Sequence, residues 1–508
     1  MADDDRPKPS FFAGIAAFNR KASLKKAVTQ VTKRDGSVVE ETLADDGSYL
    51  RATKNDGEAK DMSYLERSAS PPPSDSGKNQ ERPNNNVPLN PDAAWRTIAS
   101  EQQFLPVPTV STKDSLWKKS KHGSNNCTRI VCMSDTHGQH RDISVPKGDI
   151  LIHGGDFTST GEIKHIKDML RYFEELAFPV TVCIAGNHDM TLDLPYYDRS
   201  WRRFHRKKRF NAEEGRQAVM NMMNDTTTTN TDKTKQGKKP EFYYLEDSSC
   251  TVPIGSAKED DDDLTSQPTQ QQKEGDHDSQ KKVKFNPSVV VHKQPKTLSI
   301  YGSPWSPEFY DWAFNVARGE PSWKIWSKIP SGTDILVTHG PPLGRGDQCD
   351  HGGRAGCYDL LEQVQNRVRP RLHIFGHIHE GYGTSFDGTT LYINASNLDL
   401  GYDSVHPCTV VDLPHDPALP PRIVEPSCSI TGDDLVNGWF RDKGYEILAD
   451  VLRDSGCEGQ NLPSGDELLN TAEAYWEICR QLDFRTTTSL QAKRELRKAL
   501  SQLYAASF

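Results

Sequence analysis

The chain has no long hydrophobic run. Among its 508 residues, no stretch reaches the roughly 20 apolar residues that a membrane-spanning helix needs, and Met1 to Asp5 are acidic where a secretory signal would be basic. The ten cysteines show no C-x-x-C spacing, which argues against a zinc ribbon or a dense disulfide framework and fits a reducing compartment. These absences predict no transmembrane segment and a cytoplasmic location, with the nucleus as the alternative.

Apolar residues are also scarce, at 34% of the chain without glycine, and the net charge of −9 is small for this length. Nucleic-acid binders are usually basic, so no nucleic-acid partner is expected. The low apolar content predicts that a normal core is diluted by disordered stretches.

Polar stretches divide the chain into three parts. Residues 1–122 have little that can bury a core, which predicts a mostly disordered N-terminal region. Disordered insertions near 224–240 and 256–295 are expected within a domain at 123–425. Helical periodicity returns at 430–508, where Ser464 and Glu467 have the spacing of a capping box, and predicts a C-terminal helical segment. The tails and these helices are the candidate surface for a protein partner.

Short runs rich in Val, Ile and Leu occupy the middle of the chain, each bounded by Gly, Asn or Asp as buried strands are. Between the second and third runs, apolar residues within 161–177 recur at helical spacing. Strands alternating with helices predict an α/β layered fold. The predicted strands are 128–134, 149–153, 180–185, 298–301, 334–338, 372–375, 390–395 and 408–413.

Five short polar elements each follow one of these predicted strands. Open α/β sheets place their sites at the carboxyl ends of strands, so we expect the five to meet. Glycines beside them let the backbone turn sharply. In chain order they are Asp135-Thr136-His137, Gly155-Asp156, Gly186-Asn187-His188-Asp189, His339-Gly340 and Gly376-His377-Ile378-His379.

The residue types in these elements indicate divalent metal ions. Carboxylate, amide oxygen and imidazole together favour manganese, iron or zinc over a thiolate-type site. Asp135 and His137 straddle a turn and can reach one ion, and Asp156 can bridge two ions through its two oxygens. Two ions about 3.5–4 Å apart activate a shared water and clamp phosphate oxygens during in-line displacement.

Two other features have a simpler interpretation. His153 and His373 lie within apolar strands, and we interpret them as buried core or supporting residues. The basic run at 202–209 is interpreted as a solvated helix face rather than a polyanion patch or a nuclear signal.

The order D-x-H, G-D, G-N-H-D, H-G, G-H-x-H resembles that of the calcineurin-like metallophosphoesterases. Residues 244–247, 300–305, 354–357 and 375–383 look most like the subgroup called metallophosphoesterase domain-containing proteins. The resemblance covers about 128–413, apart from the two insertions. It implies a four-layer α-β-β-α sandwich with the metals at the sheet edge.

The resemblance also implies a role for each site residue. Asp135, His137 and His379 would bind one metal ion. Asn187, His339 and His377 would bind the other, with Asp156 bridging. His188 would contact the scissile phosphate and help protonate the leaving group, and its place beside a metal ligand fits an acid near neutral pH. The implied activity is hydrolysis of phosphate esters by a two-metal-activated water.

One departure within the superfamily bears on the substrate. Phosphoprotein phosphatases carry G-D-x-x-D-R-G at the second element, where the second Asp orients the catalytic histidine and the Arg grips phosphate. This chain has Ser159 and Thr160 there, and Ala185 where those enzymes have an Arg before G-N-H. The loss of two guanidiniums favours a phosphodiesterase or small-molecule phosphatase over a phosphoprotein phosphatase. The alternative of another class is a non-catalytic scaffold with a retained metal site.

Overall fold

The computed structural model describes residues 29–32, 38–43, 49–52, 87–115, 117, 126–227, 240–254, 296–426, 439–454, 492, 495–496, 498–499 and 502–505. The chain forms two units, Met1–Ala94 and Trp95–Phe508. The insertion expected at 256–295 and the capping box expected at Ser464 and Glu467 lie outside the described residues, and the expected domain limits stay predictions. Within the described residues, no helix has the length and apolar character of a membrane span.

The first unit contains a small antiparallel sheet within the region expected to be mostly disordered. Its strands are β1 (Thr29–Thr32), β2 (Val38–Leu43) and β3 (Tyr49–Ala52), with β2 in the centre. Helix α2 (Pro91–Ile98) begins in this unit and ends in the next.

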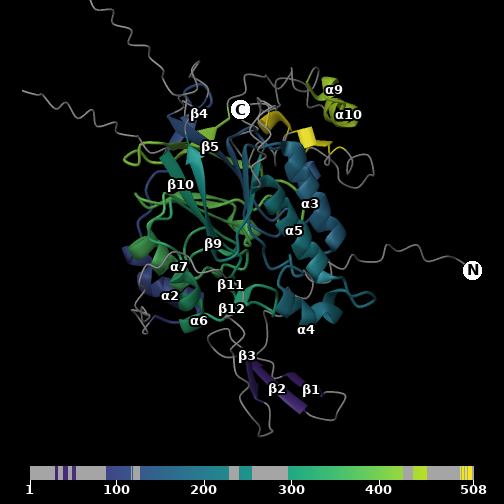
Figure 1. Cartoon of the computed structure of the whole chain (residues 1–508), viewed down its shortest axis with the longest axis vertical. Helices are drawn as coiled ribbons and strands as arrows, with labels where there is room; N and C mark the ends of the chain where they lie inside the picture. The colour runs from purple at the N-terminus through teal and green to yellow at the C-terminus, as the bar shows by residue number, and fades with distance from the viewer. Residues whose placement is uncertain are drawn as a thin grey trace, which may run out of the picture. The chain divides into compact units, whose positions relative to one another are not determined.

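The second unit is built on two large sheets (Figure 1). One has the order β4-β18-β17-β5-β6-β7-β8, the other β15-β16-β14-β13-β10-β9. The first sheet comprises β4 (Thr109–Ser111), β5 (Cys127–Met133), β6 (Ile150–His153), β7 (Val180–Cys183), β8 (Glu241–Tyr244), β17 (Thr409–Pro414) and β18 (Arg422–Glu425). The second comprises β9 (Ser248–Ile254), β10 (Lys296–Ser303), β13 (Ile335–Thr338), β14 (Leu372–Phe375), β15 (Gly383–Phe386) and β16 (Leu391–Asn394).

Helices cover the outer faces of both sheets. On the first sheet these are α3 (Ile163–Leu176), α4 (Leu194–Phe204) and α5 (Ala212–Thr227), and on the second α6 (Glu320–Trp326) and α7 (Tyr358–Gln363). Two further helices near the C-terminus are α9 (Phe440–Asp442) and α10 (Glu446–Asp454). Helix α5 extends into the range predicted as the first insertion, 224–240.

Two sheets with helices on their outer faces form an α/β fold, so the fold class predicted from the sequence is confirmed.

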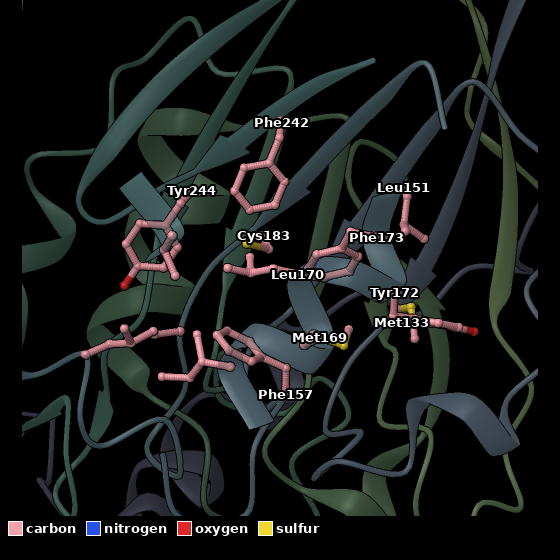
Figure 2. Packing of buried hydrophobic residues seen from close by; sticks show 14 of the residues in the cluster. Met133, Leu151, Phe157, Met169, Leu170, Tyr172, Phe173, Cys183, Phe242 and Tyr244 are labelled. Atoms are coloured by element: carbon pink, nitrogen blue, oxygen red, sulfur yellow. The ribbon is translucent and has the colours of Figure 1, made fainter. Parts of the chain in front are cut away.

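Alternating side chains along each strand create three separate core layers, because neighbouring residues point to opposite sheet faces. On β5, Ile130 and Cys132 face the second sheet, whereas Val131 and Met133 face α3. Figure 2 shows Met169, Leu170 and Phe173 of α3 against the first sheet. On the far side, Leu336 and Phe375 of the second sheet pack with Trp326 of α6 and Leu360 of α7. The layers run α-β-β-α, as the resemblance implied.

All eight predicted strands are present, as β5, β6, β7, β10, β13, β14, β16 and β17, and the predicted helix at 161–177 is α3. In the first sheet β5, β6 and β7 are parallel neighbours, and in the second β13 and β14 are parallel neighbours. Their carboxyl ends therefore meet at one edge of the sandwich, where the five polar elements follow.

A buried ion pair anchors the segment before β5. The Nε and Nη2 atoms of Arg129 donate to the Asp412 carboxylate at 2.8 and 3.0 Å, and Nη2 also donates to Ser115 Oγ. The indole of Trp117 lies 4.3 Å from the guanidinium carbon of Arg129 and donates to Asp149. Since Arg129 and Asp412 are 1% and 4% exposed, removing either partner would leave a buried charge uncompensated, at a cost of about 3–5 kcal/mol.

The second insertion can be tested through the hairpin that carries it. Ile254 at the end of β9 lies directly opposite Lys296 at the start of β10, so a two-residue turn can join them. Replacing residues 255–295 with Asn-Gly is expected to keep the melting temperature within a few degrees. The control places Pro-Pro there, which cannot adopt the positive φ of that turn and should lower the melting temperature. Insoluble expression of the Asn-Gly variant would show that the insertion is structural.

Candidate metal centre

The two sheets bring the five polar elements together at their shared edge. Asp135 and His137 follow β5, Asp156 follows β6, and Asn187 and His188 follow β7. His339 follows β13, and His377 and His379 follow β14. Within the described residues these side chains form three overlapping groups whose ligand atoms lie within 4.8 Å of one another: Asp135, His137 and His379; His137, Asp156 and His188; and Asp156, His339 and His377.

The first group contains the set of residues that the resemblance assigned to one ion. His379 Nε2 lies 3.5 Å from Asp135 Oδ1 and 3.3 Å from His137 Nε2. Both carboxylate oxygens of Asp135 lie 3.0 Å from the His377 amide, and Ser396 Oγ donates to Oδ2. Burial opposes ionisation of Asp135, but bonding to His379 and attraction to other imidazoles hold its pKa well below the usual range.

The third group, Asp156, His339 and His377, contains residues that the resemblance assigned to the other ion, and its Asp156 also belongs to the group that contains His137 and His188. Asp156 Oδ1 accepts the His188 amide at 2.7 Å, while Oδ2 lies 3.3 Å from His339 Nε2 and 3.9 Å from His137 Nε2. Asp156 Oδ2 thus faces both His137 and His339, and the bridge expected from the sequence stays a prediction. Asn187 Oδ1 lies 2.9 Å from His339 Nε2 and thereby joins this third group. Burial would lower the pKa of His339, but attraction to Asp156 raises it to about 9.

The imidazoles are oriented as metal ligands would be. His379 Nδ1 lies 3.0 Å from the Asp399 carbonyl and His339 Nδ1 lies 3.0 Å from the Gly154 carbonyl. A carbonyl only accepts, so each Nδ1 carries a proton and, in the neutral ring, each Nε2 presents a lone pair to the centre. Buried lone pairs that converge with carboxylate and amide oxygens suit a pair of borderline divalent cations. The residues present therefore fit the ions that the sequence predicted.

The backbone at the centre is strained. Positive φ values are found at four candidate ligands: Asp135 (53°), His137 (43°), Asp156 (53°) and His377 (69°). Non-glycine residues seldom adopt this conformation, and it persists only where the surroundings enforce it. Two glycines make room: a Cβ on Gly376 would collide with the Asp135 carboxylate, and one on Gly186 would collide with Asp156.

Asp189 ties two of the ligand loops together. Its buried carboxylate accepts the amides of Thr158 and Gly186 at 2.8 and 2.9 Å and the Thr158 hydroxyl at 2.7 Å. Burial and the nearby Asp156 raise the pKa of Asp189 to about 7. The loop after β6 is thereby fixed to the loop after β7, which carries Asn187 and His188.

The buried histidines of the strands support the loops, in agreement with their sequence interpretation. His153 Nδ1 accepts the Gly155 amide at 3.2 Å, and its Nε2–H donates to Thr136 Oγ1. His373 Nε2 lies 2.9 Å from Thr338 Oγ1, which donates in turn to the Gly340 carbonyl. Burial lowers the pKa of both to about 3, so they are neutral supports.

His188 is held by three contacts. Its Nδ1 donates to the Ser159 carbonyl at 2.8 Å, its ring lies 4.3 Å from that of Trp312 at 30°, and it meets the His137 ring edge-on at 4.6 Å. Ser159 occupies the place of the orienting Asp in phosphoprotein phosphatases, and here a backbone carbonyl takes the contact. Burial lowers the pKa of His188, and the Asp156 carboxylate opposes that effect.

The sequence missed three residues at the centre. Tyr402 packs its ring 4.9 Å from His137 and 5.5 Å from His379, and burial raises the pKa of its hydroxyl. Trp312 lies on His188, and Ser396 bonds to Asp135. None of them belongs to a recognisable metal-ligand spacing. Only Tyr402 lies beside a glycine, Gly401, and such a position is too common to single it out.

Comparison with known proteins agrees with this geometry. The model of the family described as calcineurin-like phosphoesterase matches residues 128–381. The chain is 38% identical to metallophosphoesterase domain-containing protein 1 of Homo sapiens over 293 residues, covering 56% of this chain and 71% of that protein, and the protein of the same name from Mus musculus gives the same values. A UPF0046 protein of Caenorhabditis elegans is 32% identical over 335 residues, covering 65% of this chain and 69% of that protein.

These matches and the buried Asp/His groups define a metallophosphoesterase. The chain belongs to the calcineurin-like phosphoesterase family.

Metal binding by the centre can be tested through stability. Ions that bind only the folded state at about 100 times their dissociation constant should raise the melting temperature by roughly 5–10 °C. Asp156→Asn removes the carboxylate charge that lies between His137 of one ligand set and His339 of the other, and it is expected to abolish most of that rise with Mn²⁺. The control is Asp198→Asn, whose side chain is 70% exposed and pairs with Arg209. An equal rise in the Asp156 variant would argue against a shared ligand.

Proposed function

We propose that the chain hydrolyses small phosphate esters, phosphodiesters in particular, at two divalent ions held by Asp135, His137 and His379 on one side and Asn187, His339 and His377 on the other. The observation that carries the proposal is Asp156 Oδ2, which lies between the two groups and within 4 Å of an imidazole of each. Bound ions would supply Lewis acidity and an activated water there. Manganese, iron and zinc all suit these ligands.

The chain's own residues orient the ester and handle the proton. His188 Nδ1–H is committed to the Ser159 carbonyl, so Nε2 is the atom that exchanges a proton with the substrate. In the charged ring, Nε2–H donates to the leaving-group oxygen as its bond to phosphorus breaks. The contacts with Trp312 and His137 restrict rotation of the ring, which preserves this alignment.

The charges around the centre favour diesters. Burial raises the pKa of Asp156, and the side chains that lower it most are His339, His188 and His137. The strongest electrostatic partners of this carboxylate are therefore imidazoles rather than arginine or lysine. A dianionic monoester on a protein loop needs more neutralisation than a monoanionic diester, and the guanidinium contacts that supply it elsewhere are lacking at Thr160 and Ala185. A protein partner on the tails or C-terminal helices and a cytoplasmic location stay predictions.

Substrate preference separates this proposal from its alternatives. With Mn²⁺ present, kcat/KM for bis-p-nitrophenyl phosphate is expected to equal or exceed that for a phosphoserine peptide. A strong preference for the peptide would favour a phosphoprotein phosphatase. Metal-dependent thermal stabilisation without turnover of either compound would favour a scaffold with a retained metal site.

The role of His188 has its own test. His188→Ala is expected to lower kcat by about 10²–10⁴-fold, the usual range for loss of general acid catalysis, while the thermal shift with Mn²⁺ persists. The loss should grow as the leaving group becomes a weaker acid. Equal losses for p-nitrophenyl and alkyl leaving groups would exclude the proton-donor role.

A further inference from the structure

A short loop beside His188 is rich in aromatic residues. It consists of residues 308–314, between β11 (Ser306–Pro307) and β12 (Asn315–Val316), and we refer to it as the aromatic loop. Because Ser306 pairs with Asn315, the loop leaves and re-enters the fold at the same place (β11 and β12 in Figure 1). Its aromatic members are Phe309, Tyr310, Trp312 and Phe314.

Helix α4 clamps the aromatic loop from one side. Asp193, which caps α4 by accepting the Tyr196 amide, also accepts the Phe314 amide at 2.9 Å. Tyr196 Oη donates to the Asp311 carbonyl at 2.8 Å, and Arg203 Nη1 donates to the Tyr310 and Asp311 carbonyls at 2.8 and 2.6 Å.

Asn315 closes the aromatic loop from the other side. Its Oδ1 accepts the amides of both Phe309 and Trp312, at 3.0 and 3.2 Å. With clamps on both sides, the loop presents its side chains in a fixed arrangement, which lowers the entropy lost when a ligand binds.

This arrangement of the loop requires backbone strain and leaves two aromatic rings exposed to water. Tyr310, Asp311 and Phe314 have φ values of 50°, 49° and 50°, a conformation that bulky residues rarely adopt. Phe309 and Tyr310 are 56% and 42% exposed, although aromatic rings are normally buried. Their rings meet edge-to-face, with centroids 4.3 Å apart. A strained backbone that holds an aromatic pair in water marks a functional surface.

The aromatic loop is continuous with the metal centre through Trp312. That indole packs against His188, with ring centroids 4.3 Å apart, and against Phe204 of α4, with ring centroids 4.8 Å apart. The loop therefore borders the side of the centre on which His188 stands. If His188 protonates the leaving group, the leaving group departs on the side of the centre where Trp312 and the aromatic loop lie.

Resting on the function proposed above, we propose that the aromatic loop is a leaving-group subsite for phosphate esters whose leaving group carries a planar aromatic ring. A flat ring can add to the Phe309 and Tyr310 pair in the offset or edge-to-face geometries that aromatic rings prefer. An aliphatic group of the same size gains only apolar contact. The exposed Arg203 of α4, which donates to two carbonyls of the loop, adds positive charge beside it and attracts an anionic ester.

The test uses three diester analogues with the full-length, Mn²⁺-loaded protein: the monomethyl esters of phenylphosphonic, cyclohexylphosphonic and methylphosphonic acid. A P–C bond replaces the bond to the leaving group, and all three carry one negative charge. Calorimetry is expected to show the phenyl compound binding about two- to tenfold more tightly than the cyclohexyl compound, the range for one aromatic pair. Phe309→Leu is expected to abolish this preference.

The control variant is Phe104→Leu, the same substitution at a ring that is 54% exposed and packs on Arg345 instead. It should keep the preference. Equal affinities of the wild-type protein for the phenyl and cyclohexyl compounds, with the methyl compound still bound, would overturn the subsite and leave the proposed function intact. Binding of none of the three would overturn both. A Phe309→Leu effect confined to oligomeric state, measured by light scattering, would identify the loop as a contact between copies of the chain and also overturn the subsite.

Discussion

Two buried carboxylates set the conditions that the rest of the centre has to meet. Asp135 and Asp156 are 0% and 2% exposed, and an uncompensated buried carboxylate costs several kcal/mol. Three of their protein donors, the amides of His377 and His188 and the hydroxyl of Ser396, are neutral and offset only part of this cost. The rest requires positive charge beside the carboxylates, which is why the pKa of the adjacent His339 is raised to about 9. A pair of divalent ions meets that need, and the strained backbone keeps the acids in place to hold them.

The ligands come from two different sheets, so the distance between the sheets determines the geometry of the centre. Residues such as Ile152 of β6 and Val337 of β13 fill the space between the sheets and are fully buried. Close-packed interiors resist compression and expansion, so this layer fixes the separation of the loops above it. Substitutions far from the metals can therefore alter catalysis by shifting one sheet against the other, without contact with any ligand.

The sequence predicted the strands with continuous apolar runs, because burial on both faces leaves a strong pattern. Edge strands such as β9 and β15 were missed, since their exposed residues interrupt that pattern, as in Ser248–Ile254. The candidate ligands were found through spacing after strands. Trp312 and Tyr402 were not, because their positions depend on loops with positive φ near Asp311 and at Tyr402 and on contacts with residues distant in the chain. Spacing carries information about neighbours in sequence, whereas those two residues reach the centre only through tertiary structure.

The carbonyl that orients His188 has an evolutionary consequence. The acceptor belongs to the backbone of Ser159, so no substitution of that side chain can delete it. An enzyme that orients its histidine with a carboxylate can lose the contact through one codon change, whereas this contact is protected from such changes as long as the loop keeps its path. The Ser159 hydroxyl donates to the His137 carbonyl at 2.7 Å and helps to keep that path. Substitutions at position 159 would therefore change the orientation of His188 only gradually, through the geometry of the loop. The sequence of the site can thus vary while the histidine stays aligned.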